Sequence, residues 1–80
     1  MTIMLRLKNI KIEGNKAEAD FYPEDSKEAG HIVVGLDAEE VVSCKDVSGY
    51  GESYRGHAKM ALIKMAKENN TTTERTVMWY

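Results

Sequence analysis

The side chains with the greatest chemical potential are one cysteine and two histidines, Cys44, His31 and His57. A cysteine activated by a histidine base, with a carboxylate such as Asp46 to orient that base, would form a nucleophilic site. Nothing in the spacing of these residues enforces that geometry, and a lone cysteine in a valine-rich segment is usually a small buried hydrophobe. Cysteine-dependent catalysis is therefore the least favoured of three functional hypotheses, and we predict no catalytic residue.

The remaining signals for site chemistry are weak. The two histidines and the cysteine lie far apart in the sequence and make a poor zinc site. The glycine-rich stretch 49–56 leads into a helical pattern, as phosphate-binding loops do. It lacks the lysine-serine or lysine-threonine pair of a P-loop, and it places Glu52 where an anion would dock. We predict no metal site and no cofactor.

One amphipathic helix is predicted over residues 53–69. Its apolar residues recur at helical spacing and cover about a third of the circumference. They are Tyr54, Ala58, Ala61, Leu62, Met65 and Ala66. Ser53 is a suitable N-cap, and Asn69 and Asn70 can end the helix in a left-handed conformation. In a chain this short, such a helix must pack on a sheet.

The predicted helix also carries four bases, Arg55, Lys59, Lys64 and Lys67. Together with nearby tyrosines they could contact phosphates and stack on bases. The net charge of −2 would repel a polyanion from the rest of the chain. An accessory nucleic-acid-binding protein that uses this helix face is our second hypothesis.

The N-terminal quarter predicts a β-hairpin. Gly14 and Asn15 suit a two-residue type II′ turn, which places Ile12 opposite Ala17. The apolar alternation then changes phase after Leu7. One extra residue near Lys8 and Asn9, forming a β-bulge, would set Leu7 opposite Phe21. Apolar residues then meet across the strands, and the other face of the hairpin is polar.

Three further strands complete the pattern. Residues 31–36 and 41–47 predict a strand pair. Its residues Val33, Val34, Val41 and Val42 suggest that the pair is buried on both faces, or at least central in the sheet. A four-residue connection places Val33 opposite Cys44, whereas a five-residue connection sets Ile32, Val34 and Leu36 against Val42 and Cys44. The sequence does not choose between these registers. Residues 76–80 predict a last strand that is apolar on both faces, and therefore interior or covered.

These elements predict a single α+β domain over residues 1–80. The order is β-β-β-β-α-β, with a mainly antiparallel sheet of four to five strands and one helix packed on one face. The strand order in the sheet is left open. No apolar run approaches the roughly 20 residues that a membrane helix needs. A secretion signal is not apparent and Cys44 has no disulfide partner in the chain, so we expect a cytoplasmic protein with no membrane association.

Surplus apolar residues suggest an interface. Gly56, Met60 and Ile63 project from the helix on the side away from its main stripe, between the lysines. Met78, Trp79 and Tyr80 add apolar surface at the C-terminal end. Methionine is common at adaptable contact surfaces. Our leading hypothesis is therefore a small non-catalytic interaction or assembly module, which binds a protein partner or forms a homodimer.

Overall fold

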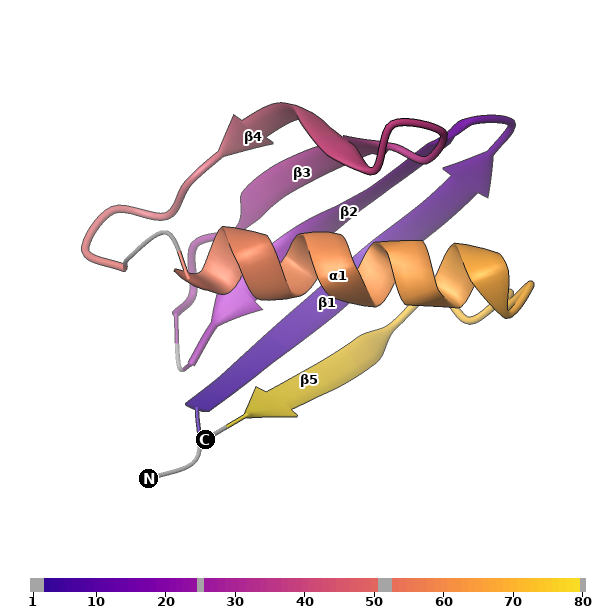
Figure 1. Cartoon of the computed structure of the whole chain (residues 1–80). Helices are drawn as coiled ribbons and strands as arrows, with labels where there is room; N and C mark the ends of the chain where they lie inside the picture. The colour runs from indigo at the N-terminus through magenta and orange to yellow at the C-terminus, as the bar shows by residue number, and fades with distance from the viewer. Residues whose placement is uncertain (1–2, 25, 51–52, 80) are drawn as a thin grey trace.

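The computed structural model of the chain describes residues 3–24, 26–50 and 53–79. The elements run in the order β1 (Ile3–Glu13), β2 (Lys16–Pro23), β3 (Gly30–Gly35), β4 (Glu40–Lys45), α1 (Ser53–Lys67) and β5 (Arg75–Trp79). This confirms the predicted α+β class and element order (Figure 1). No helix within the described residues has the length and apolar character needed to span a bilayer.

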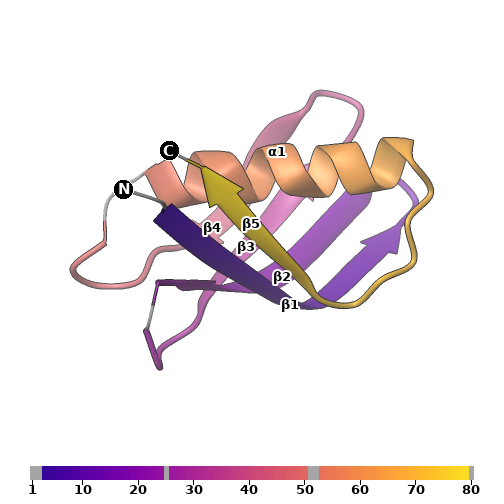
Figure 2. The ribbon, with the colours of Figure 1, turned by 90° about the horizontal axis from the view of Figure 1, so that it is seen from below.

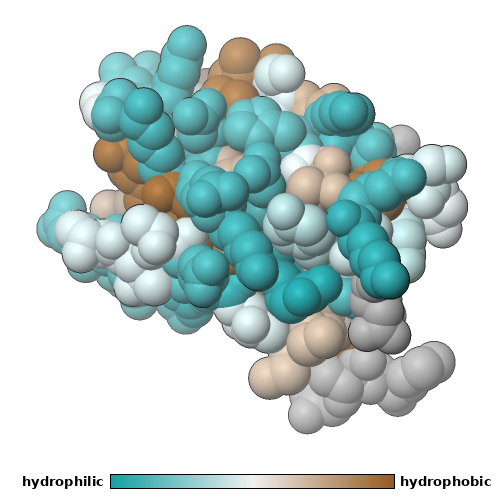
Figure 3. Space-filling view, turned by 180° about the vertical axis from the view of Figure 1, so that it is seen from behind, coloured by the Kyte–Doolittle hydropathy of each residue, from teal (hydrophilic) through white to brown (hydrophobic). Residues whose placement is uncertain are grey.

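The five strands form one antiparallel sheet in the order β4-β3-β2-β1-β5. Helix α1 lies across one face of this sheet, as views from the front and from below both show (Figures 1 and 2). We call the opposite side the open face. It is mainly hydrophilic when the molecule is seen from behind (Figure 3). The strand order places β4 and β5 at the two edges of the sheet.

The first hairpin has the predicted register, including Ile12 opposite Ala17 and Leu7 opposite Phe21. Gly14 has φ 56°, as the first position of a type II′ turn requires. The pairing shifts between Lys8 and Lys11, and Asn9 adopts φ 54° at that point. This β-bulge changes the phase of β1, so that apolar side chains on both sides of it point toward α1.

The core lies between α1 and the covered face of the sheet. Alternate residues of β1, β2 and β3 enter it, as expected for a sheet covered on one side. The buried apolar residues are Leu5, Leu7, Ile10, Ala17, Ala19, Phe21, Ile32, Val34, Val47, Ala58, Ala61, Leu62, Ile63 and Met65. Burial of each large side chain stabilises the fold by about 1.5–3 kcal/mol. The predicted helix stripe is confirmed, with Tyr54 and Ala66 half-buried at its margins.

The helix ends as its asparagines predict. Asn69 lies in the left-handed region with φ 54°. Its N–H donates to the carbonyl of Ala66 at 3.2 Å, and the N–H of Asn70 donates to the carbonyl of Met65 at 2.9 Å. This pair of bonds is a Schellman motif, which satisfies carbonyls that the end of a helix leaves without partners.

The predicted positions of the later strands are wrong. The 41–47 segment contributes an edge strand, β4, and the last strand is the other edge rather than an interior strand. Val42 and Met78 are 59% and 64% exposed. Ile32 pairs with Cys44, but a shift by one residue then sets Val34 opposite Val41, and a four-residue turn over 36–39 follows. Apolar residues on both faces of a strand did not distinguish a central strand from an edge.

Candidate interaction site at the β5 edge

β5 is a regular edge strand. Its five residues pair with β1 without interruption, from Trp79 opposite Ile3 to Arg75 opposite Leu7. Its other side is the edge of the sheet. A regular edge of this kind is a ready template for pairing with another chain.

The backbone groups that β5 turns outward can be assigned. The carbonyl of Met4 accepts a 2.9 Å hydrogen bond from the N–H of Glu24, so the backbone groups of Met4 point toward β2. The side to which backbone groups point alternates along an antiparallel strand, and the residues next to Met4 therefore point toward β5. Val77 consequently bonds to β1. Thr76 and Met78 direct their N–H and C=O groups to the outside of the sheet.

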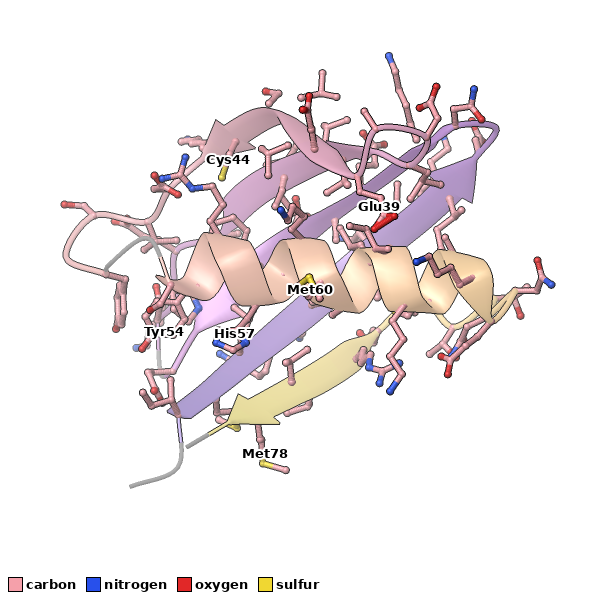
Figure 4. The ribbon with its side chains drawn as sticks, viewed as in Figure 1. Glu39, Cys44, Tyr54, His57, Met60 and Met78 are labelled. Carbon is pink, nitrogen blue, oxygen red and sulfur yellow. The ribbon has the colours of Figure 1, made fainter. Side chains whose placement is uncertain are left out.

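A groove of about 450 Å³ runs between α1 and β5, and we call it the β5 groove. It is lined by His57, Met60, Ala61 and Lys64 from α1 and by residues 75–78 of β5. Ala61 is buried and Val77 half-buried, so they supply its apolar floor. Figure 4 shows His57 on the side of the helix toward β5, Met60 on the outward surface of the helix, and Met78 on the far side of the strand.

A second hollow of about 370 Å³ borders β5 toward its N-terminal end. Its lining includes Arg6, Lys8, Glu74 and Arg75. Arg6 and Lys8 both lie over the ring of Tyr22, with their charged groups 5.5 and 5.7 Å from the ring centroid. These cation–π contacts hold two bases on the open face. Basic side chains therefore border β5 on both sides of the sheet.

The predicted interface residues have different environments. Gly56 is exposed, and Met60 and Met78 are 62% and 64% exposed. Ile63 is only 6% exposed, so its predicted position on an outer helix surface is wrong. The side chain of Trp79 and the whole of Tyr80 lie outside the described residues.

The burial of Ile63 has a geometric cause. Arg55, Lys59, Ile63 and Lys67 form one row along α1, because residues four apart share a helix flank. Arg55 pairs with Asp46 and Lys67 pairs with Glu39, each at 3.6 Å. Both acids flank β4, so this row faces the β4 side of the sheet and Ile63 is covered there. The sequence analysis assigned one buried face to the helix and did not predict the contact between its flank and the β4 side of the sheet.

The four bases predicted for nucleic-acid binding do not form one surface. Arg55 and Lys67 face β4 and are paired with acids, and Lys59 lies half-buried between them. Lys64 lies on the other flank, in the β5 groove. The bases that accompany it, Arg75, Arg6 and Lys8, come from the strands and were not singled out by sequence. The sequence predicted a polar face on the first hairpin, which carries Arg6, but it did not show that the last strand pairs beside it.

The candidate catalytic residues are separated. Ile32 pairs with Cys44 and His31 with Lys45, so Cys44 and His31 lie on opposite faces of the sheet. His57 lies in the β5 groove. The Cys44 thiol donates to an Asp46 carboxylate oxygen at 3.3 Å, and burial, together with that hydrogen bond, raises the pKa of Cys44 to about 11. The thiol is therefore protonated at neutral pH, which opposes nucleophilic chemistry.

The histidine instead joins an acidic cluster on the open face. His31 Nδ1 lies 2.8 Å from Asp20 Oδ1, and His31 Nε2 lies 3.6 Å from a carboxylate oxygen of Glu18. Asn9 Nδ2 donates to Asp20 at 2.9 Å. The hydrogen bond with His31, followed by that with Asn9, lowers the pKa of Asp20. The ionised Asp20 carboxylate stabilises the fold above the ordinary Asp pKa, and this contribution is lost as pH falls through the lowered pKa of Asp20.

No group of three or more His, Cys, Asp or Glu side chains in the described ranges is arranged to hold a metal ion. Comparison of the chain with protein-family models, with curated proteins and with solved structures finds no match. The β5 edge combines outward hydrogen-bonding groups with an adjacent groove that has an apolar floor.

Proposed function

We propose that this chain is a non-catalytic interaction module that binds an extended segment of a partner protein along β5. The observation that supports this function is an uninterrupted edge strand bordered by a groove that a helix forms on one side. Addition of a strand to an exposed sheet edge is a common mode of peptide recognition, in which backbone bonds give affinity and alternate side chains give specificity.

The energetic basis of such binding is modest but sufficient. Each backbone hydrogen bond to the outward groups of Thr76 and Met78 contributes about 0.5–1.5 kcal/mol net. Alternate side chains of the added strand would point into the β5 groove, over Ala61 and Val77. Met60, at 62% exposed, can adjust to them because its unbranched side chain is flexible.

The occupant of the edge is a partner protein or a second copy of this chain. Pairing of two β5 strands in a homodimer would bring together two surfaces that both carry Lys64 and Arg75. Like charges at close range oppose that arrangement, so we favour a different protein as the partner. We propose the cytoplasm as the compartment, since the lone Cys44 thiol persists under reducing conditions.

Amide hydrogen exchange on the isolated chain tests this function. The probe is a short peptide in which valine alternates with glutamine, and light scattering reports the mass of the chain with and without it. We expect the amides of Thr76 and Met78 to exchange fast in the free chain and slowly with the probe, while the β4 amides in the same sample stay unchanged. Equal exchange in both samples would contradict the proposal.

A proline substitution provides the matched variant. Thr76→Pro removes an outward N–H and leaves the bonds of Val77 to β1 in place, so the fold should persist by circular dichroism. Binding of the probe should be lost. A mass of two chains in the light scattering, abolished by the same variant, would identify a second copy as the occupant.

A further inference from the structure

From the charges around β5 we infer that the bound segment is an acidic extended peptide, with carboxylates at alternate positions. This inference rests on the proposed function and specifies the partner of the same site. The helix side of the site supplies Lys64, which is exposed, and Arg75, which is half-buried at the start of the strand. Both line the β5 groove, where they can pair with carboxylates of an added strand.

The open face supplies a second set of bases. Arg6 and Lys8 line the hollow beside the N-terminal end of β5, and the contacts with Tyr22 hold them there. Arg6 also donates to the carbonyl of Ser26 at 3.3 Å, which further fixes its position. Glu74 is the acid in that hollow. Successive residues of a strand point to opposite faces, so carboxylates on either face of an added strand would meet a base.

Apolar contacts complete the site on the helix side. Ala61 and Val77 form the floor of the β5 groove and Met60 borders it. In a peptide in which valine alternates with glutamate, all the glutamates point to one face of the added strand. When they enter the β5 groove, their CH2 groups lie over this floor and their carboxylates reach Lys64 and Arg75, while the valines lie on the open face.

The same bases could attract a nucleic acid, but the edge favours a peptide. Thr76 and Met78 present both donors and acceptors, since each has an outward N–H and an outward C=O. A peptide backbone satisfies both kinds of group. A phosphodiester backbone offers acceptors to the N–H groups and cannot donate to the carbonyls, so it would leave half of the edge without hydrogen bonds.

The test compares three fluorescein-labelled peptides in which valine alternates with glutamate, glutamine or lysine. Fluorescence anisotropy gives the dissociation constant of each at low and at moderate salt. We expect the glutamate peptide to bind about tenfold more tightly than the glutamine peptide, which corresponds to about 1.4 kcal/mol from several weak ion pairs. This advantage should shrink as salt is added, and the lysine peptide should bind least.

Charge-reversal variants locate the effect. Lys64→Glu and Arg75→Glu should each remove most of the preference for glutamate and improve binding of the lysine peptide. Lys45→Glu is the matched control, because Lys45 is an exposed base on the opposite edge strand. It changes the net charge equally and should leave the preference intact. Loss of the preference in all three variants would mean that overall charge, and not the β5 groove, attracts the peptide, and would overturn the inference.

The remaining outcomes separate the inference from the function beneath it. Equal affinity for the glutamate and glutamine peptides, with protection of the Thr76 and Met78 amides, overturns the acidic preference and leaves the interaction module standing. Absence of protection with every peptide overturns both. A single-stranded oligothymidine that displaces the glutamate peptide, and whose own binding is lost in Lys64→Glu, would assign the site to nucleic acid and overturn the inference.

Discussion

The two edge strands of the sheet differ in the regularity of their pairing and in their contacts with α1. Along β4, the ladder is interrupted by a register shift, and ion pairs at both ends connect the strand's flanks to α1, Arg55 with Asp46 and Lys67 with Glu39. Along β5 the ladder is regular, and the space beside α1 is an open groove. Bulges and charges are common means of preventing unwanted pairing at an edge. The molecule applies them at β4 and leaves β5 suited to accept a strand.

The charges follow the same division. The β4 side carries Asp37, Glu39, Glu40 and Asp46, and the helix bases on that flank are used to neutralise two of them. The β5 side collects Lys64, Arg75, Arg6 and Lys8. The helix therefore has bases on both flanks, which form ion pairs with acids beside β4 and line the groove beside β5. The composition of the helix alone cannot separate the two flanks.

The largest effect is expected from a substitution in the hydrophobic core, on which both edge strands pack. Leu62 of α1 is 0% exposed, and Leu62→Ala should lower the free energy of unfolding by about 2–5 kcal/mol through lost burial and the cavity left behind. Urea unfolding measures the loss. Amide protection should fall together in β4 and β5, because one core holds both.

The control for this variant is Lys64→Ala. Lys64 is exposed, so its removal should change the free energy of unfolding by less than about 0.5 kcal/mol. If Leu62→Ala lowers protection in one edge strand only, the two edges do not share a core, and the comparison between them must be made element by element.

Substitutions at two glycines give the next largest effects, and these change the free energy of unfolding in opposite directions. A β-carbon at Gly30 would collide with the ring of Phe21 and the carbonyl of Lys45, so Gly30→Ala should cost about 1–3 kcal/mol and loosen β4 from β3. Gly56 has open space around its α-carbon, and Gly56→Ala should stabilise the helix by about 0.5–1 kcal/mol. Thermal unfolding of both variants checks the signs.

The local consequence separates the two edges. Hydrogen exchange in Gly30→Ala should accelerate most in β4 and least in β5, since Gly30 lies against Lys45 and Phe21, and β2 and β1 separate it from β5. A uniform acceleration would show that the β3–β4 contact stabilises the entire sheet. Destabilisation by Gly56→Ala would instead indicate that this position cannot accept a β-carbon.

Sequence predicted the elements better than their surroundings. Local signals sufficed for the hairpin register, because turn chemistry at Gly14 and the phase change after Leu7 act over a few residues. The Asn69 cap was equally local. The positions of β4 and β5 depend on which strands meet across the sheet, and a single sequence does not encode that in any nearby pattern. Their valine-rich and aromatic composition therefore suggested interior strands.

The candidate site shows the same limit. Met60 and Met78 were identified because an apolar residue among polar ones is visible in the sequence. Ile63 was misplaced because the flank of the helix that β4 covers depends on how the helix packs on the folded sheet. The bases beside β5 come from two strands and the helix, and only the fold brings them together.

A smaller effect concerns the ion pairs that close the β4 side. The four side chains involved are 32–69% exposed, so Glu39→Gln and Asp46→Asn should each cost only about 0.2–1 kcal/mol. The two losses should add, because the pairs lie at opposite ends of α1. Urea unfolding at low and high salt measures them, and the difference between variant and parent should shrink with salt.

The double variant also tests why β4 does not accept a strand. With both ion pairs removed, the register shift in β4 remains, and we expect the valine–glutamine probe still to protect β5 amides only. New protection of β4 amides would show that the ion pairs alone had closed that edge.

The last prediction concerns the reactivity of Cys44, which reports on the β4 edge. With a pKa of about 11, on the order of one thiol in a thousand is ionised at pH 8, so labelling by a thiol-specific reagent should be slow and should rise steadily up to about pH 11. In the urea-unfolded chain the rate should reach half of its maximum near pH 8.5, the ordinary thiol pKa. Asp46→Asn removes the carboxylate that disfavours the thiolate, and should raise the native rate at pH 8 several-fold. Glu39→Gln breaks an ion pair of the same edge without touching the thiol, and should leave the rate unchanged. Equal acceleration in both variants would mean that loosening of β4, and not the pKa of Cys44, controls access to the sulfur.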